Sequence, residues 1–132
     1  MFRKIKNEIL GREYSLSVGF ISSRKSRMIN KKYRGKDKAT NVLAFPLAKS
    51  EGEILLCPSV IASEAKKSKK TYQEWEGFLV IHGMLHLKGM RHGGIMEKAE
   101  KKYYEKYLDR NRPGIREDAR RRRRISKGRK IS

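Results

Sequence analysis

All three histidines of the chain lie in one eleven-residue segment, HGMLHLKGMRH, which covers residues 82–92. His82 and His86 are four residues apart, so on a helix their rings project from the same face one turn apart. Gly89 has a permissive backbone that can turn the chain, which allows His92 to reach the same point from another direction. Three imidazoles at this spacing predict a site for a divalent metal ion.

The predicted ligands are therefore His82, His86 and His92, and they leave one tetrahedral position open for water or substrate. Neutral imidazoles suit Zn²⁺, and we expect one ion per chain. Ni²⁺, Co²⁺ or Fe²⁺ accept the same ligands, and affinity alone would even favour Cu²⁺. The alternative is three ordinary histidines on an apolar helix, which would explain any one of them well but explains the clustered set poorly.

A helical His-x-x-x-His pair also occurs in zinc proteases, where a Glu directly after the first His is the general base. Here that position is Gly83, which argues against peptide hydrolysis. An ion with three neutral ligands keeps its double charge, can lower the pKa of its water towards about 7 and can stabilise a phosphorane-like transition state. The resulting hydroxide would be a nucleophile at neutral pH.

The elements that must position this segment follow from the spacing of apolar residues. Helices are predicted over 2–13, 22–33, 58–70, 73–88 and 95–108, and strands over 14–20, 41–45 and 53–57. Pro46 is expected to close the second strand, and Gly89 to end the fourth helix in a left-handed cap. The residues predicted to face inward on the last helix are Ile95, Ala99, Tyr103 and Leu108.

The charge of the chain indicates the class of partner. Lys and Arg number 34 against 14 Asp and Glu, a formal net charge of +20, which predicts a polyanionic partner, nucleic acid ahead of acidic lipid. Residues 116–132 hold nine Lys or Arg, two acids and almost nothing to bury. We expect one domain over 1–112 and a basic, disordered tail over 113–132. The alternative is a protein that is basic only for solubility.

Cysteine usage and hydropathy indicate the compartment. A lone Cys57 excludes an intramolecular disulfide, which suits a reducing cytosol, and we give it no catalytic role. No apolar run approaches the roughly 20 residues that span a bilayer, and the first residues lack the apolar core of a secretory signal. We expect a cytoplasmic protein that does not associate with membranes, and the sequence does not determine its oligomeric state.

Three segments together resemble the YbeY family of bacterial metal-dependent endoribonucleases implicated in ribosomal RNA processing. They are HGMLHLKGMRH, YRGKDKATNVLAFP (33–46) and GEILLC (52–57), and the resemblance covers roughly residues 16–108. It implies an α+β fold in which a small mixed sheet is covered by helices and the three histidines bind a metal on a helix and the following turn. It also implies that Arg34 lies in the active-site cleft as a substrate-binding or catalytic residue.

Arg34 has an independent argument in its favour, because a guanidinium offers a rigid fork that matches two phosphate oxygens. The alternative is a solvated surface charge, which composition alone would favour. The place of Arg34 in the RGKD motif favours a functional role instead. Lys36, Lys38 and Arg91 are weaker candidates for the same cleft. Arg91 also stands where the family usually has an acid, so we expect the hydrogen bond of an acid to the histidine shell to be absent.

Together with the histidine cluster and the charge, this resemblance implies a metal-dependent, single-strand-type endoribonuclease that acts in ribosomal RNA maturation and hydrolyses RNA phosphodiesters with a histidine-bound Zn²⁺. The nucleophile would be either metal hydroxide or a 2′-hydroxyl of the substrate, and the sequence does not choose between them. Its partners would be RNA, in particular ribosomal RNA or ribosomal particles. The alternative, from another class, is a non-catalytic RNA-binding or ribosome-associated factor whose metal is structural.

Overall fold

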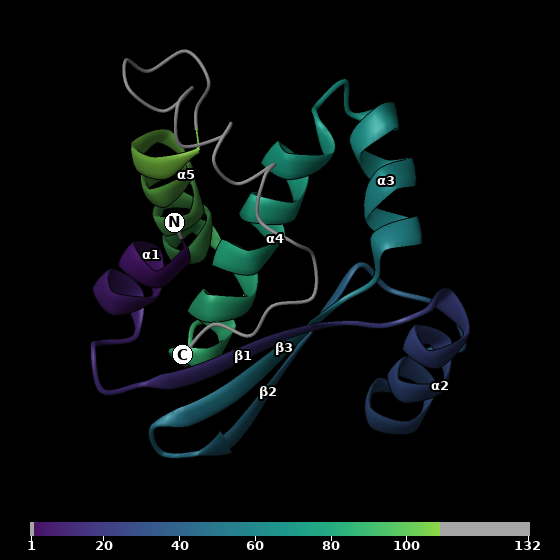
Figure 1. The fold of residues 1–132 in the computed structure, drawn as a ribbon. Helices are drawn as coiled ribbons and strands as arrows, with labels where there is room; N and C mark the ends of the chain where they lie inside the picture. Colours follow the sequence, from purple (N-terminus) through teal and green to yellow (C-terminus); the bar gives the residue numbers. More distant parts are fainter. Residues whose placement is uncertain (1, 109–132) are drawn as a thin grey trace.

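The computed structural model describes residues 2–108, and in this range the chain forms five helices and one three-stranded sheet (Figure 1). In chain order the elements are α1 (Phe2–Ile9), β1 (Ser15–Phe20), α2 (Ser23–Arg34), β2 (Val42–Ala48), β3 (Glu51–Leu56), α3 (Pro58–Lys67), α4 (Tyr72–Leu87) and α5 (Gly94–Tyr107). The predicted α+β class is confirmed. The predicted tail over 113–132 lies outside the described residues, so the division into domain and tail stays a prediction.

The sheet is mixed and has the strand order β1-β3-β2. The central strand β3 pairs with β1 in parallel and with β2 in antiparallel orientation. Our prediction that Pro46 closes the second strand is wrong, because β2 continues to Ala48 with an irregular register between these two residues. β2 lies at the edge of the sheet, where the missing N–H of a proline need not interrupt the ladder.

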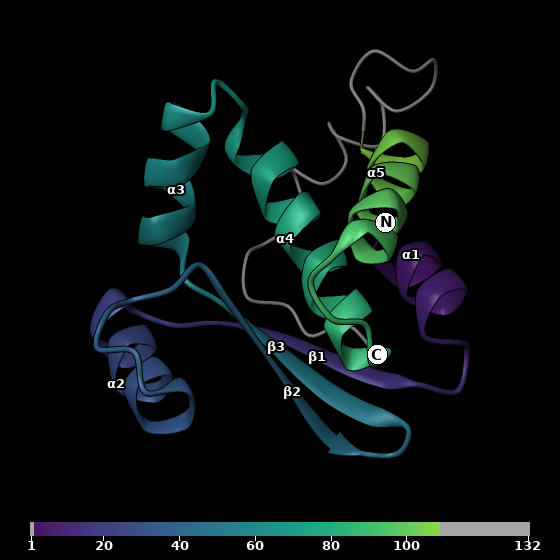
Figure 2. The same cartoon turned by 180° about the vertical axis from the view of Figure 1, so that it is seen from behind.

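The core lies between the sheet and α4. Leu16, Val18, Ile54 and Leu56 alternate with more exposed residues along β1 and β3, and all four are at most 2% exposed. Val80, Ile81, Met84 and Leu85 of α4 pack in the same cluster and are fully buried. Figures 1 and 2 show α4 between α3 and α5, with α1 beside α5. A helix covered on nearly every side can be apolar all round, as the FLVI block of α4 is.

Local capping signals determine where two of the helices begin. The Ser22 side chain accepts a hydrogen bond of 3.1 Å from the backbone N–H of Lys25 at the start of α2. At the start of α4, the Thr71 side chain accepts from the Glu74 backbone while the Glu74 carboxylate accepts from the Thr71 backbone. This capping box sets the phase of α4, and therefore the face on which its histidines lie.

A buried lysine holds the connection after α1. Lys6 is only 2% exposed, and its Nζ donates to the backbone carbonyls of Gly11, Arg12 and Tyr14 at 3.3, 3.2 and 2.9 Å. The amine of Lys88, just beyond the end of α4, donates to the Ile9 carbonyl at 3.0 Å. The Lys6 bonds thus hold the loop after α1. The Lys88 bond ties the turn after α4 to the end of α1.

On α2 and α5, the buried residues differ in part from those that the spacing of apolar residues predicts. Ile95, predicted to face inward, is 80% exposed, and the buried positions of α5 are Met96 and Glu100. Ala99, Tyr103 and Leu108 pack against the core as predicted. On α2 the buried residues are Ser26 and Asn30, which hold the following loop by hydrogen bonds. The residue at which a helix begins decides which of its side chains face inward. The start of α5 has no side-chain cap, because Gly93 and Gly94 precede its first side chain, so the sequence did not indicate where the helix begins.

Among the residues that the structure describes, no helix is both long enough and apolar enough to cross a membrane.

Candidate metal centre

The last two turns of α4 bring His82 and His86 together. Their Nε2 atoms are 3.0 Å apart, and their ring centroids are separated by 4.5 Å. Both side chains are half-buried, at the end of the helix that has the sheet on one side and α5 on another. The predicted placement of these two rings on one face of a helix is confirmed.

The turn after α4 adds the third imidazole. Gly89 adopts a left-handed backbone with a φ of 105°, and the next N–H, that of Met90, bonds back to the Leu85 carbonyl at 3.0 Å. The predicted left-handed cap at Gly89 is thus confirmed. It reverses the chain so that the His92 ring lies 5.1 Å from the His82 ring and 4.8 Å from the His86 ring. One nitrogen from each of the three side chains falls within 4.8 Å of the others.

A buried carboxylate supports the cluster, and the sequence analysis missed it. Glu100 of α5 is 8% exposed, and its Oε2 lies 2.5 Å from Nδ1 of His82. Our expectation that Arg91 deprives the histidine shell of an acid's hydrogen bond is therefore wrong, because Glu100 provides that bond from another element. Glu100 lies four residues after Met96, the other buried residue of α5, so the two share its inward stripe. The sequence carried no signal for this, because the inward stripe that it predicted began at Ile95.

The hydrogen bond to Glu100 assigns a tautomer to His82. A carboxylate accepts, so Nδ1 of His82 donates, which leaves the Nε2 lone pair directed at the other two imidazoles. Burial is the main cause that lowers the pKa of His86, and the neighbouring His82 and His92 lower it further. A lowered pKa favours the neutral imidazole, the form that binds metals.

Gly83 has a packing role next to the first histidine. A Cβ atom at this position would lie 2.9 Å from Cδ1 of Ile54 on β3, so α4 packs more closely on the sheet than a side chain would allow. Position 83 thus faces the sheet, whereas His82 faces Glu100 on α5. A general base of the zinc-protease kind has no room here, which agrees with the prediction against peptide hydrolysis.

The donor set fits a single divalent transition-metal ion. Two nitrogens each about 2.0–2.1 Å from a tetrahedral ion lie roughly 3.3 Å apart, close to the 3.0 Å between Nε2 of His82 and Nε2 of His86. His92 is exposed and comes from a turn, so its ring can adjust to close the set. An exposed third ligand also leaves one side of the cluster accessible to solvent, as an open site requires.

Arg34 lies on α2 and not on the elements that carry the histidines. It is the last residue of α2, exposed, and followed by the left-handed Gly35 cap. Within the described residues no hydrogen bond or ion pair joins it to the three histidines, so the structure does not bring the predicted catalytic arginine into direct contact with them. Lys36, Lys38 and Arg91 are likewise exposed.

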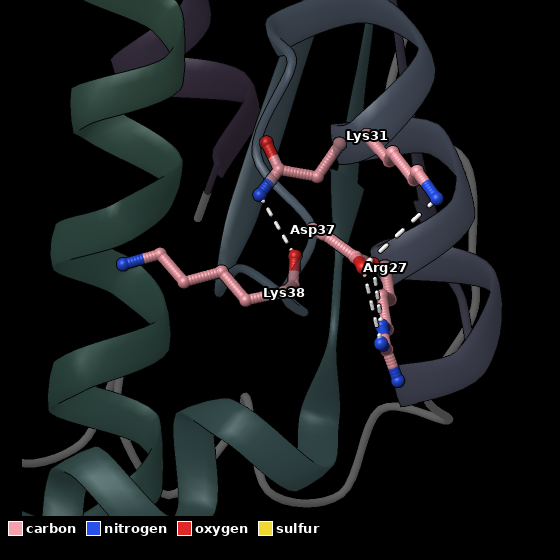
Figure 3. A network of polar contacts seen from close by, with 5 residues as sticks. Arg27, Lys31, Asp37 and Lys38 are labelled. Atoms are coloured by element: carbon pink, nitrogen blue, oxygen red, sulfur yellow. Dashed lines mark hydrogen bonds and ion pairs between the residues drawn. The ribbon is translucent and has the colours of Figure 1, made fainter.

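The loop after Arg34 is held by a polar network (Figure 3). Arg27 pairs with Asp37 at 2.7 Å and Lys31 approaches the same carboxylate at 3.9 Å, whereas the side chain of Lys38 extends away from this group. The carbonyl of Lys38 accepts from the buried Asn30 at 2.8 Å. The loop that carries the RGKD motif is thus fixed in place, and it presents cations to solvent.

The family model described as endoribonuclease YbeY matches residues 2–109. The chain belongs to the YbeY family. The resemblance inferred from three short segments therefore extends over all of the described residues, 2–108.

Relatives and a solved structure agree with this assignment. Endoribonuclease YbeY of Cupriavidus metallidurans is 41% identical over 91 residues, which cover 65% of this chain and 46% of that protein. That of Methylobacillus flagellatus is 38% identical over 94 residues, or 69% and 63% of the two chains. The chain thus spans about half the length of the curated YbeY relatives it matches. The solution structure of TM1509 from Thermotoga maritima superposes with a TM-score of 0.57 at 33% identity, covering 79% of this chain and 77% of that one.

Proposed function

We propose that this chain is a metal-dependent endoribonuclease that cleaves single-stranded RNA during ribosomal RNA maturation. Its metal would be one Zn²⁺ ion held by His82, His86 and His92. The observation that carries the proposal is the convergence of three imidazole nitrogens within 4.8 Å of one another, in a chain that belongs to an endoribonuclease family. RNA as substrate also agrees with the formal net charge of +20.

The residues around the cluster have separable roles in this proposal. Glu100 orients the His82 ring and holds a proton on Nδ1, so that Nε2 stays available. The exposed His92 lies at the side from which a phosphodiester can approach. When bound, the ion would supply Lewis-acid chemistry, polarising a phosphate oxygen and making water more acidic. Arg91, exposed and adjacent to His92, is placed to contact a phosphate near the ion.

Arg34 is proposed to bind a phosphate further along the same RNA strand. Its side chain is exposed, and within the described residues it pairs with no acid, so its five donors are free for a phosphate. Such a contact positions the substrate across the molecule. Ribosomal particles as partners and a cytoplasmic location are part of the same proposal.

One observation favours a second candidate, a ribosome-associated RNA-binding factor with a structural metal. Glu100 is the acid that contacts the histidines, yet it is buried and engaged with His82 Nδ1. A carboxylate in that position cannot also serve as a general base towards substrate. Among the described residues no other acid hydrogen-bonds to the three histidines, so a catalytic base would have to come from the RNA or from solvent.

Metal analysis combined with single-turnover cleavage tests the proposal. Purified protein should carry about one ion per chain, and His86→Ala should lose both the ion and cleavage of single-stranded RNA, because too few ligands remain. Ile95→Ala is the matched control, since Ile95 lies three residues after His92 and is 80% exposed. Metal content in His86→Ala equal to that of wild type would remove the site. A metal-loaded protein that binds RNA but never cleaves it would establish the second candidate instead.

A further inference from the structure

Two aromatic side chains are in contact on the face of the sheet opposite α4. Tyr33, near the end of α2, is 63% exposed, and Phe45 of β2 is half-buried. Their ring centroids are 5.6 Å apart at an interplanar angle of 67°. Phe45 alternates with Ala44, which packs with the core, so Phe45 projects to the other side of the sheet. Figures 1 and 2 place α2 apart from α1, α4 and α5, and the helix that it contacts is α3.

The aromatic pair lies inside a strongly cationic surface. Residues 23–38 hold eight Lys or Arg and one acid, Asp37. That acid is engaged by Arg27 and Lys31, so Lys32, Arg34 and Lys36 have no acidic partner among the described residues. Single exposed apolar side chains are ordinary on protein surfaces. An exposed tyrosine that contacts a second ring and is surrounded by unpaired cations is the combination that single-stranded nucleic acids bind, with rings for bases and cations for phosphates.

Lys32 contributes to both parts of this combination. Its Nζ lies 5.4 Å from the centroid of the Tyr33 ring. An exposed lysine has a flexible stem, so the same ammonium can leave the ring for a phosphate when a base covers Tyr33. Phe45 contacts Tyr33 nearly edge-on, which limits the motion of the tyrosine ring without covering it as a parallel stack would.

The aromatic pair is connected to the metal centre through the edge of the sheet. Phe45 is followed by Pro46, which pairs with Gly52 of β3. Gly52 in turn lies against Leu87, because a Cβ at Gly52 would be 3.0 Å from both methyl groups of that leucine. Leu87 directly follows His86. Since β2 is an edge strand, a polynucleotide can pass around it from one face of the sheet to the other without crossing the ladder.

We propose that Tyr33, backed by Phe45 and flanked by Lys32 and Arg34, is a base-stacking subsite for single-stranded RNA. It would hold an unpaired base of the same strand whose scissile phosphate lies at the three histidines, and this inference rests on the proposed RNA substrate. Because a stacked base must be unpaired, the subsite selects single strands over duplexes. It contacts the base ring and not its hydrogen-bonding edge, so it selects little for sequence.

Binding of a 2′-O-methyl oligonucleotide tests the subsite. The oligonucleotide lacks the 2′-hydroxyl nucleophile, and gel electrophoresis after the titration verifies that metal hydroxide has not cleaved it. Tyr33→Ala should lower affinity for a short single strand by about 5- to 150-fold and leave affinity for the matched duplex unchanged. The slope of log affinity against log salt should not change, because no charge is removed. Tyr33→Phe should keep wild-type affinity, since the ring is retained. Quenching of 2-aminopurine in the oligonucleotide should be lost in Tyr33→Ala and kept in Tyr33→Phe.

Met28→Ala is the matched control, because Met28 lies on the same helix and is also 63% exposed. It should bind both oligonucleotides as the wild type does. Equal single-strand affinities of wild type and Tyr33→Ala would overturn the subsite, and so would an equal loss for single strand and duplex. An acidic protein as the true partner of this surface would give the first of these results. If the wild-type protein itself binds no RNA, the proposed function fails at its first step, which separates that failure from failure of the subsite alone.

Discussion

Substitution of Glu100 should weaken metal binding without altering any of the three histidines. The carboxylate is 8% exposed and lies 2.5 Å from Nδ1 of His82, so it holds the ring in one orientation and one tautomer. Removing such a partner of a metal ligand typically costs 10- to 100-fold in metal affinity, or about 1.4–2.7 kcal/mol. We expect the losses of metal affinity caused by Glu100→Gln and by Glu100→Ala to lie at opposite ends of this range.

The difference between them follows from hydrogen-bond chemistry. The amide oxygen of Gln can still accept from His82 Nδ1, so Glu100→Gln loses the charge but keeps the tautomer, and about a 10-fold loss is expected. Alanine removes the acceptor. The buried Nδ1–H is then unsatisfied and the ring is free to turn, so about a 100-fold loss is expected.

Competition with a chromophoric chelator measures the zinc affinity of each variant, and circular dichroism confirms that it is folded. Glu97→Gln is the control, because Glu97 lies one turn earlier on α5 and is exposed. It should retain wild-type affinity. Wild-type zinc affinity in both Glu100 variants would refute the argument that this carboxylate orients His82.

Two further predictions concern residues away from the histidines. Arg34→Ala should leave metal content intact and slow RNA cleavage, and Arg34→Lys should restore part of the rate because it keeps the charge without the fork; equal rates for Arg34→Ala and wild type, in single-turnover assays, would exclude the proposed role. Lys6→Met should lower the free energy of unfolding by about 2–4 kcal/mol, because three backbone carbonyls lose a buried charged donor. Urea denaturation measures this, with the exposed Lys4→Met as control; a shift no larger than that of the control would contradict the capping role of Lys6.

Much of the metal centre follows from short-range geometry. Two histidines four residues apart on a helix must share a face, and a glycine after the last turn can reverse the chain, so the cluster of His82, His86 and His92 was predictable from spacing alone. The helix starts at Ser22 and Thr71 are local in the same sense, because a cap involves residues within three positions of each other. Period-2 alternation likewise identified β1.

Other features depend on contacts between segments far apart in the chain. Glu100 reaches His82 from a different helix, eighteen residues away, and only the packing of α5 on α4 determines which of its acids turns inward. Pro46 remains in β2 because that strand is at the edge of the sheet, which depends on strand order and not on local propensity.

The sequence by itself thus determined the chemistry of the three imidazoles, since ligand type and helical spacing are local properties. The tertiary structure alone decided what surrounds them, namely the carboxylate behind His82 and the close approach of Gly83 to Ile54. It also decided that Tyr33 meets Phe45 on the opposite face of the sheet. The physical reason is that side-chain orientation across elements depends on how a helix is rotated against its neighbours. A rotation of one residue, about 100°, changes which side chain faces the site.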